Sequence, residues 1–147
     1  MEEKGLVLEP ADERHAKAIA RLRAERIGWL GTIGRDGYPH AVPVWFLWHD
    51  DAIIVFNQPG SAKVKNLREN PRAFFHLEAG ADTAQVHVLQ GDAEVSDTPA
   101  KDWAATLTTP FLEKYALDLQ YLGQTLEELW SGYSVVTILR PRRLITL

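Results

Sequence analysis

The stretch IGWLGTIGRDGYPHAVPVWFLWHDDAIIVFNQ, residues 27–58, contains three apolar segments that are separated by two short polar turns. The tripeptide RDG is a hairpin signal between strands expected at 29–33 and 39–48, and HDD indicates a second turn before a strand at 52–56. Each segment would then pair with the one before it. We therefore predict three consecutive antiparallel strands, which makes the protein mainly β.

The middle segment, residues 39–48, is apolar on both faces of the expected strand. Side chains alternate between the faces, so one face would carry Val42, Val44, Phe46 and Trp48, and the other Ala41, Pro43, Trp45 and Leu47. Antiparallel sheets usually leave one face in water. We therefore expect the protein core to cover one face, and a ligand, another element or a second subunit to cover the other. Pro39 and Pro43 lack backbone donors, which indicates an edge or bulged strand.

The remaining segments surround this meander with further strands and with helices. We expect an amphipathic helix at 10–27, strands at 72–78 and 85–95, a helix from Thr98 to about Leu117, a short helix that begins with the capping box TLEE at 125–128, and one or two final strands interrupted at Pro141. About six strands that come in hairpins predict an antiparallel β-barrel with outer helices. The 147 residues fit a single domain, 1–147.

Composition and charge exclude several classes of function. The net charge of -4 disfavours nucleic acid as a partner, and the lack of cysteine removes disulfides, thiolate zinc sites and cysteine nucleophiles. The five histidines lack the spacing of metal ligands, so we expect no metal. The sequence shows neither a signal peptide nor an apolar run near the roughly 20 residues of a membrane span. We therefore expect a cytoplasmic protein with no membrane partner.

The segment SAKVKNLRENP, residues 61–71, follows the third strand and is expected to form a short helix. Ser61 is a good N-cap, and Pro71 disfavours helical geometry at Asn70. Backbone donors and the dipole at a helix start favour an anion. The segment therefore predicts an anion site, and a surface connector with solvated lysines is the alternative interpretation.

The two lysines of this segment are expected to point in different directions. Lys63 and Lys65 are two positions apart, which separates them by about 200° around a helix. Lys63 shares a face with Leu67, which we expect in the core. Lys63 is therefore the better candidate to bind an anion, beside the end of the preceding strand.

The run from about Arg26 to Glu94 resembles the pyridoxamine 5'-phosphate oxidase-like superfamily, whose split β-barrels bind flavins or deazaflavins. The matching features are a helix that leads into the hairpin GWLGTIGRDGYPHAVPVWF, a strand that ends before SAKVKNLRENPRAFF, and LQGDAEV on the next long strand. The most specific of them is the spacing K-x-x-N-L-x-x-N-P at Lys63, Asn66, Leu67, Asn70 and Pro71.

The resemblance implies a homodimer of six-stranded split barrels that bind FMN in clefts between the subunits and transfer hydride to or from a small-molecule redox substrate. It implies that Lys63 holds the cofactor phosphate and that the backbone of residues 43–46 lies along the flavin ring. The cofactor-binding residues that it suggests are Lys63, Ser61, Asn57, Gln58, Asn66, Pro43, Val44, Trp45 and Phe46. It assigns no catalytic acid or base.

Two alternatives stay open at this point: a reductase that uses the deazaflavin coenzyme F-420, and a non-catalytic module that binds flavin or haem. The first helix offers Arg14, Lys17, Arg21 and Arg26 either to the anionic tail of a deazaflavin or to solvent. FMN is favoured because the overall charge is acidic. Trp45 and Trp103 could border a planar ligand, Tyr115 and Tyr121 could shape a substrate pocket, and His76 and His87 could face each other on adjacent strands.

Overall fold

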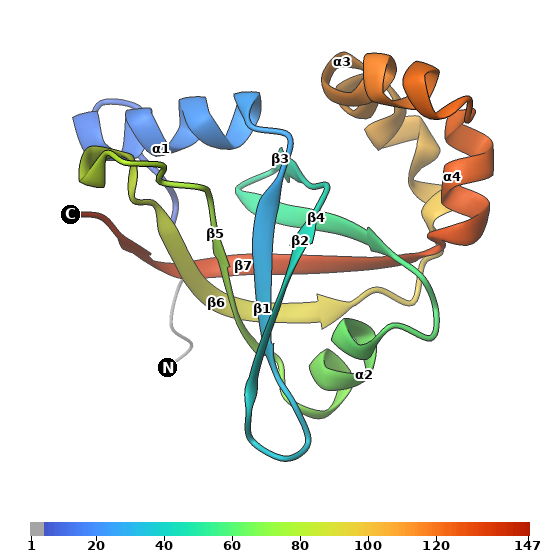
Figure 1. Ribbon diagram of the computed structural model, residues 1–147, viewed down its shortest axis with the longest axis horizontal. Coiled ribbons are helices and arrows are strands. Elements are labelled where there is room, and N and C mark those ends of the chain that lie inside the picture. The colour runs from blue at the N-terminus through green and yellow to red at the C-terminus, as the bar shows by residue number, and fades with distance from the viewer. Residues whose placement is uncertain (1–4) are drawn as a thin grey trace.

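The computed structural model describes residues 5–147. The helices and strands are α1 (Glu13–Ala24), β1 (Gly28–Ile33), β2 (Pro39–Val44), β3 (Leu47–His49), β4 (Ala52–Asn57), α2 (Ala62–Glu69), β5 (Arg72–His76), β6 (Val88–Val95), α3 (Ala104–Leu122), α4 (Leu126–Gly132) and β7 (Val135–Ile145) (Figure 1). Short 3-10 turns lie at Thr83–Gln85 and Ala100–Trp103. Within the described residues, none of the helices combines the length and the apolar character needed to cross a membrane.

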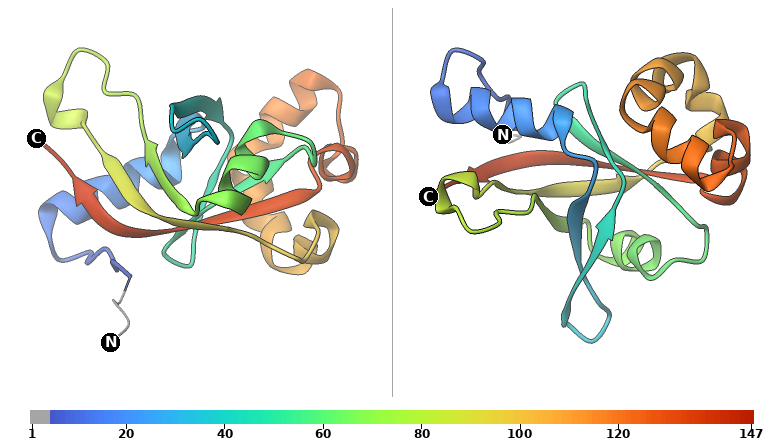
Figure 2. Two further views of the ribbon diagram at one scale, coloured as in Figure 1. Left: turned by 90° about the horizontal axis from the view of Figure 1, so that it is seen from below. Right: turned by 45° about the horizontal axis from the view of Figure 1, so that its top comes forward.

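The strands form one seven-stranded sheet in the order β2-β1-β5-β6-β7-β4-β3, and every neighbouring pair is antiparallel. The sheet is strongly curved; α1 lies at one end of it and the α3–α4 hairpin at the other, while α2 lies beside the central strands (Figures 1 and 2). This is the expected fold class, a mainly antiparallel split β-barrel with outer helices. The count is seven strands because one expected strand is divided into two.

The division occurs in the apolar segment at 39–48. The prediction of a single strand there is wrong, because β2 ends at Val44 and pairs with β1, whereas β3 begins at Leu47 and pairs with β4. Trp45 and Phe46 therefore leave the sheet between two pairings. The prediction of an edge strand is confirmed, since β2 is the first strand of the sheet.

Several other boundaries differ from the expected ones. The first helix covers only 13–24, because the Asp12 side chain caps its start by accepting from the N–H groups of Arg14 and His15. Pro141 does not interrupt the last strand, because β7 continues through it. The irregularity appears in the pairing instead: the register with β6 shifts between Gln90 and Gly91, opposite Pro141. The sharp chain path suits Gly91, where a Cβ atom would lie 2.1 Å from the Arg140 carbonyl oxygen.

The helical hairpin also begins differently from the prediction. Thr98 does not start a helix; a 3-10 turn at 100–103 leads into α3, which then extends to Leu122. The expected strand at 85–95 begins only at Val88, after another 3-10 turn. The predicted N-cap at Thr125 is confirmed, because its hydroxyl accepts the Glu128 N–H at 3.1 Å.

Two hydrophobic clusters lie on opposite faces of β4 and β7: one inside the barrel, called the barrel cluster, and one beneath α3. On β4, Ile53 and Val55 point into the barrel cluster, whereas Ile54 between them points under α3. On β7, Leu139 points into the barrel cluster. Each buried aliphatic side chain contributes about 1.5–3 kcal/mol of transfer free energy. The second cluster therefore anchors α3 and α4 to the sheet at one end of the barrel.

Candidate functional site

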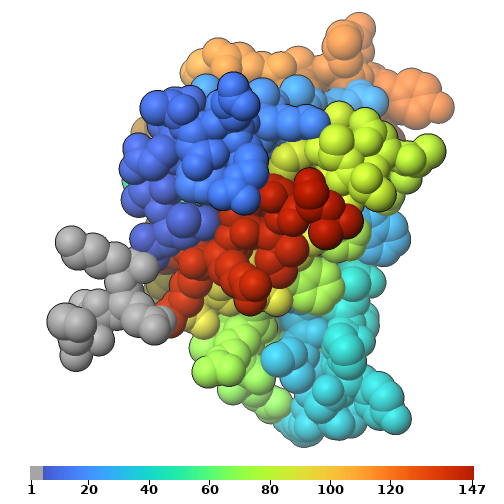
Figure 3. All heavy atoms as spheres, turned by 90° about the vertical axis from the view of Figure 1, so that its left-hand side faces the viewer, coloured from blue at the N-terminus to red at the C-terminus, as the bar shows by residue number. Residues whose placement is uncertain are grey.

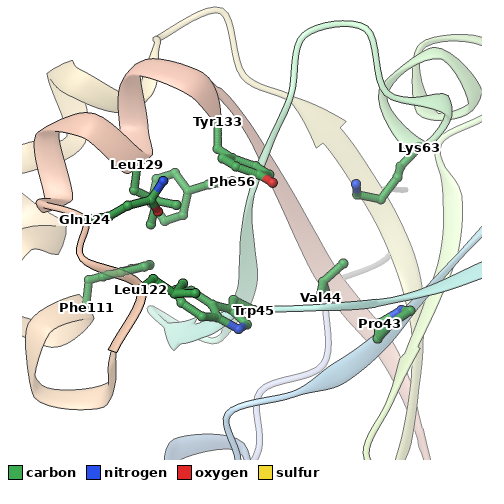
Figure 4. A pocket seen from close by; sticks show the side chains of 10 residues that line it. All are labelled: Pro43, Val44, Trp45, Phe56, Lys63, Phe111, Leu122, Gln124, Leu129 and Tyr133. Carbon is green, nitrogen blue, oxygen red and sulfur yellow. The ribbon is translucent and has the colours of Figure 1, made fainter. Parts of the chain in front are cut away.

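A cavity of about 470 Å³ lies between the end of β2, the start of α2 and the α3–α4 hairpin (Figure 4). Its lining is mostly apolar and aromatic and consists of Pro43, Val44, Trp45, Phe56, Lys63, Phe111, Leu122, Gln124, Leu129 and Tyr133. The volume and the small number of polar groups are typical of sites for small organic molecules and cofactors. This is the pocket in which the sequence-predicted lysine lies.

Helix α2 presents Lys63 to this cavity. Val64 and Leu67 are buried, as expected for Leu67, and this fixes the orientation of the helix. Lys63 is half-buried and lines the cavity, whereas Lys65 is exposed. Among residues 5–147 the structure shows no hydrogen bond or ion pair to the Lys63 ammonium, and burial lowers the pKa of this lysine. A partly desolvated cation with no counter-ion among the described residues therefore faces the cavity.

The residues around the start of α2 occupy different environments. Ser61 stands at the N-cap position without a capping bond, and its buried Oγ has no partner within residues 5–147. Asn57 is fully buried, and its amide nitrogen donates to the Val135 carbonyl at 3.0 Å and to the Thr137 hydroxyl at 3.1 Å. Gln58 is exposed. Asn57 therefore ties β4 to β7. Neither Asn57 nor Gln58 lines the cavity, and Ser61 lies just outside the lining, two residues before Lys63.

Two further candidates also lie outside the lining. The Asn66 amide nitrogen donates to the Thr32 hydroxyl at 3.0 Å and so ties α2 to β1. The Phe46 ring is buried in the barrel cluster, 4.6 Å from the Phe75 ring. The candidates that the structure brings together in the cavity are Pro43, Val44, Trp45 and Lys63.

The break between β2 and β3 is held by Tyr115 of α3. The Tyr115 hydroxyl accepts the Phe46 N–H at 2.9 Å and lies 2.6 Å from the Arg26 carbonyl oxygen, to which it donates. The Trp45 ring stacks on the Tyr115 ring, with centroids 4.6 Å apart and planes 9° from parallel. Tyr115 therefore replaces sheet pairing at the break and also fixes the tryptophan that lines the cavity.

Lys114, the neighbour of Tyr115, holds the same segment. Its ammonium donates to the carbonyl oxygens of Leu22 and Phe46, each at 3.1 Å, and lies 3.5 Å from the centre of the Phe46 ring. Burial lowers the pKa of Lys114 to about 7, and the nearby Glu25 carboxylate opposes this shift. The ammonium thus joins the end of α1, the strand break and α3.

The expectation that Tyr115 and Tyr121 shape a substrate pocket is not met, and Lys114 is not among the residues that the sequence indicates. The structure buries Tyr115 completely behind Trp45, and leaves Tyr121, the other tyrosine suggested for the pocket, 91% exposed. A signal was present in the sequence: the i, i+4 series Leu107, Phe111, Tyr115 and Leu119 marks the buried face of α3.

Several basic side chains in α1 and just after it form hydrogen bonds or ion pairs within the chain. The Arg21 guanidinium donates to the carbonyl oxygens of Gln85 and Glu78, and its Nη1 lies 2.9 Å from His87 Nδ1. Lys17 donates to the Ala84 carbonyl at 2.8 Å. These acceptors all lie in the loop between β5 and β6, and Figure 3 shows α1 packed against this loop and the end of β7. The expectation of a basic face open to solvent or to a ligand is therefore wrong for Arg21, whereas Lys17 remains exposed to solvent.

The remaining expectations for this region concern Arg26 and two histidines. Arg26 forms an ion pair with Asp118 of α3 at 2.9 Å. His76 does not face His87, because its partner across the sheet is Val88. The His87 ring is buried, and burial together with the Arg21 charge lowers its pKa. Within residues 5–147, no group of three or more His, Asp or Glu side chains is placed to hold a metal ion.

The solved structures that resemble this fold include the following three. An F420 reductase is 18% identical with a TM-score of 0.62, and the match covers 86% of this chain and 94% of that chain. An FAD-binding protein from Mesorhizobium loti is 21% identical with a TM-score of 0.61, and the match covers 88% of this chain and 90% of that protein. The haem storage protein HutZ from Vibrio cholerae is 19% identical with a TM-score of 0.63, and the match covers 96% of this chain and 95% of that protein. At these identities the likeness shows the fold alone.

Comparison with family models gives a more direct assignment. A search of curated proteins found none that matches this chain. The family model described as pyridoxamine 5'-phosphate oxidase matches residues 14–146, which is nearly the whole chain and includes the cavity and both halves of the split barrel. The chain therefore belongs to the pyridoxamine 5'-phosphate oxidase family.

Proposed function

We propose that this protein is a flavin-dependent oxidoreductase that binds FMN in the cavity between β2, α2 and the α3–α4 hairpin. The observation that carries the proposal is the Lys63 ammonium, which is half-buried, unpartnered within residues 5–147, and directed at an apolar cavity of about 470 Å³. A cation in such a place lacks the counter-charge that buried cations normally have. An anionic ligand would supply it.

The phosphate of FMN fits the residues at the Lys63 end of the cavity. A charge-assisted hydrogen bond to phosphate would offset the desolvation that lowers the pKa of Lys63. Ser61, two residues earlier, has a buried Oγ without a partner in the described chain, and the start of α2 directs backbone donors outward. These features together support Lys63 and Ser61 as the phosphate-binding residues.

The flavin ring fits the wall formed by the end of β2. Pro43, Val44 and Trp45 line the cavity, and Trp45 is held against Tyr115, so the wall is apolar and fixed in position. When bound, such a cofactor supplies hydride transfer, that is two electrons and one proton, between a donor and an organic acceptor. The role of the chain is then to orient the ring, to hold the phosphate and to exclude water.

We also propose that the protein is a homodimer, with the cofactor close to the interface. The β2 edge leaves Ala41 and Pro43 exposed, although the segment to which they belong is apolar on both faces. A second subunit would cover this edge. Light scattering at micromolar concentration tests this: we expect about twice the chain mass of 16.6 kDa, and a monomer would contradict it.

The deazaflavin coenzyme F-420 is the second candidate cofactor, and we rank it behind FMN. Its long anionic tail needs several cations, and of the four basic residues considered for it Lys17, Arg21 and Arg26 have partners within the chain, whereas Arg14 is exposed on α1. A non-catalytic haem module is the third candidate. Among the described residues that line the cavity, Tyr133 is the only one of a type that commonly binds haem iron.

Titration of the purified apoprotein with FMN, coenzyme F-420 and haem tests these proposals. We expect FMN to bind at micromolar concentration and to shift its visible absorption on binding, and the other two to bind at least tenfold more weakly. Tight binding of F-420 with undetectable FMN binding would reverse the order of the cofactors. Binding of haem alone would contradict the proposed oxidoreductase function.

A further inference from the structure

We propose that the substrate sharing this cavity is a neutral, planar aromatic molecule that carries no phosphate or carboxylate, and that the α3–α4 hairpin provides its binding wall. This inference rests on the proposed cofactor site, because it concerns the space that remains once Lys63 holds the cofactor phosphate. Three features support it: the division of the lining between two walls, the count of cations, and the shape of the hairpin wall.

The cavity has two walls that come from different parts of the chain. One wall consists of the end of β2 with Lys63 of α2 beside it, and the other belongs to the hairpin (Figure 4). The residues that the hairpin contributes are Phe111, Leu122, Gln124, Leu129 and Tyr133. A cofactor ring along β2 would therefore leave the hairpin wall facing the second ligand.

The number of cations limits the charge of that ligand. Among the described residues that line the cavity, Lys63 is the only charged one. Once Lys63 is paired with the cofactor phosphate, the described residues of this chain offer no further counter-charge to a second phosphate or a carboxylate, and burying such a group unpaired is strongly unfavourable. A phosphate ester of the kind that the family name mentions is therefore not the substrate that we expect here.

The hairpin wall favours a flat apolar molecule. Phe111 lies edge-on to Phe56, with ring centroids 5.6 Å apart, and Leu122 and Leu129 extend the apolar surface toward solvent. Aromatic and leucine side chains favour planar partners through contact area and ring stacking.

The polar groups on this wall are few and neutral. Gln124 is exposed, and the Tyr133 hydroxyl points across the cavity toward Lys63 (Figure 4). Each can form a hydrogen bond to a ketone or hydroxyl oxygen of a ligand without requiring it to carry charge. We therefore expect an aromatic molecule with one or two such oxygens.

A matched pair of probes tests the inference: 2-naphthol and 2-naphthyl phosphate share one ring system and differ in the phosphate. FMN binding is measured first, and the FMN-saturated protein is then titrated with each probe by calorimetry. We expect 2-naphthol to bind at least tenfold more tightly than 2-naphthyl phosphate. Equal or tighter binding of the phosphate, or no binding of 2-naphthol, would overturn the inference.

A variant that adds a cation to the hairpin wall should change this preference. Gln124→Lys places a second ammonium at the cavity, and we expect it to strengthen binding of 2-naphthyl phosphate about tenfold relative to 2-naphthol. Gln120→Lys makes the same change at an exposed position outside the lining and should leave the ratio unchanged. Because both glutamines are exposed, neither change removes buried surface.

The outcomes separate the two proposals. If FMN does not bind, the proposed cofactor site is wrong and the inference is overturned with it. If FMN binds but the affinity for 2-naphthyl phosphate relative to 2-naphthol is the same in Gln124→Lys and Gln120→Lys, the cofactor site stands and the hairpin wall is not the substrate-binding surface. Only FMN binding, a preference for 2-naphthol and a change specific to Gln124→Lys support both.

Discussion

Two basic side chains of this molecule that are partly withdrawn from water, Arg21 in α1 and Lys63 in α2, differ in their partners. The Arg21 side chain is 13% exposed and donates to backbone carbonyls in the loop between β5 and β6. Lys63 is half-buried, and within residues 5–147 its ammonium has no acceptor. Burial alone therefore does not identify a ligand-binding cation. A basic side chain whose N–H groups already have acceptors within the chain, such as Arg21, stabilises the fold. One that has none among the described residues, such as Lys63, can still donate hydrogen bonds to a ligand.

Replacement of Arg21 should give the largest effect on stability. Arg21→Ala removes charge-assisted bonds to the Gln85 and Glu78 carbonyls, and we expect the free energy of unfolding to fall by about 2–4 kcal/mol. Urea denaturation measures this change. Arg23→Ala, on the exposed side of the same helix, is the control and should cost less than about 0.5 kcal/mol. Equal effects of the two would show that the internal acceptors of Arg21 do not stabilise the fold.

Replacement of Lys63 should affect binding and not stability. Lys63→Ala removes one charge-assisted contact to phosphate, worth about 1.5–3 kcal/mol, so we expect FMN affinity to fall about ten- to a hundredfold with the fold retained. Lys65→Ala is the matched control, because Lys65 is exposed on the same helix, and it should cost well under about 1 kcal/mol of binding free energy. Calorimetric titration that finds both variants equally impaired would contradict the assignment of Lys63 as the anchor.

Tyr115 combines a structural role with an effect on the cavity, so its replacement should give a smaller effect on each. Tyr115→Phe keeps the ring beneath Trp45 but leaves the Phe46 N–H without its acceptor. We expect a loss of about 1–2 kcal/mol of stability and a several-fold loss of FMN affinity. Tyr121→Phe, at an exposed position, should change neither quantity. Unchanged FMN affinity in a destabilised Tyr115→Phe protein would show that the strand break does not position the cavity wall.

The last prediction is a pH dependence of stability that comes from Lys114. Its pKa is about 7 in the folded protein and near 10.5 when unfolded, so between these values the unfolded chain binds more protons. The contribution of Lys114 to stability should therefore rise as the pH increases from about 7 toward 10. Lys114→Met should show a shallower rise in denaturation experiments at several pH values, and an identical slope in both proteins would contradict the assignment.

The sequence predicts the fold class and the orientation of α2 because both depend on local patterns. Alternating apolar residues and the RDG turn indicate the β1–β2 hairpin, and the spacing of Lys63 and Leu67 on one helix face is enough to direct the lysine toward the cavity. These features need no information about distant parts of the chain. They were therefore accessible before the structure.

The strand break and the partners of the basic residues depend on distant contacts. The Phe46 N–H is paired with a tyrosine 69 residues later, and Arg21 with carbonyls 57 and 64 residues later. Period-2 alternation continues through Trp45 and Phe46, so nothing local marks the break. The same limit explains why Asn57 looked like a cofactor ligand, although its amide is used by β7.

The position of the α3–α4 hairpin has a consequence for protein engineering. The hairpin connects β6 to β7, which are adjacent antiparallel strands, and the bond from the Ser96 N–H to the Val136 carbonyl, 2.8 Å, closes its base. A segment whose two ends meet in this way can be exchanged as a cassette without altering the strand pairing beneath it. A library of hairpins grafted at this base would vary the cavity wall on a constant barrel, provided that each graft keeps the lysine and tyrosine that hold the strand break.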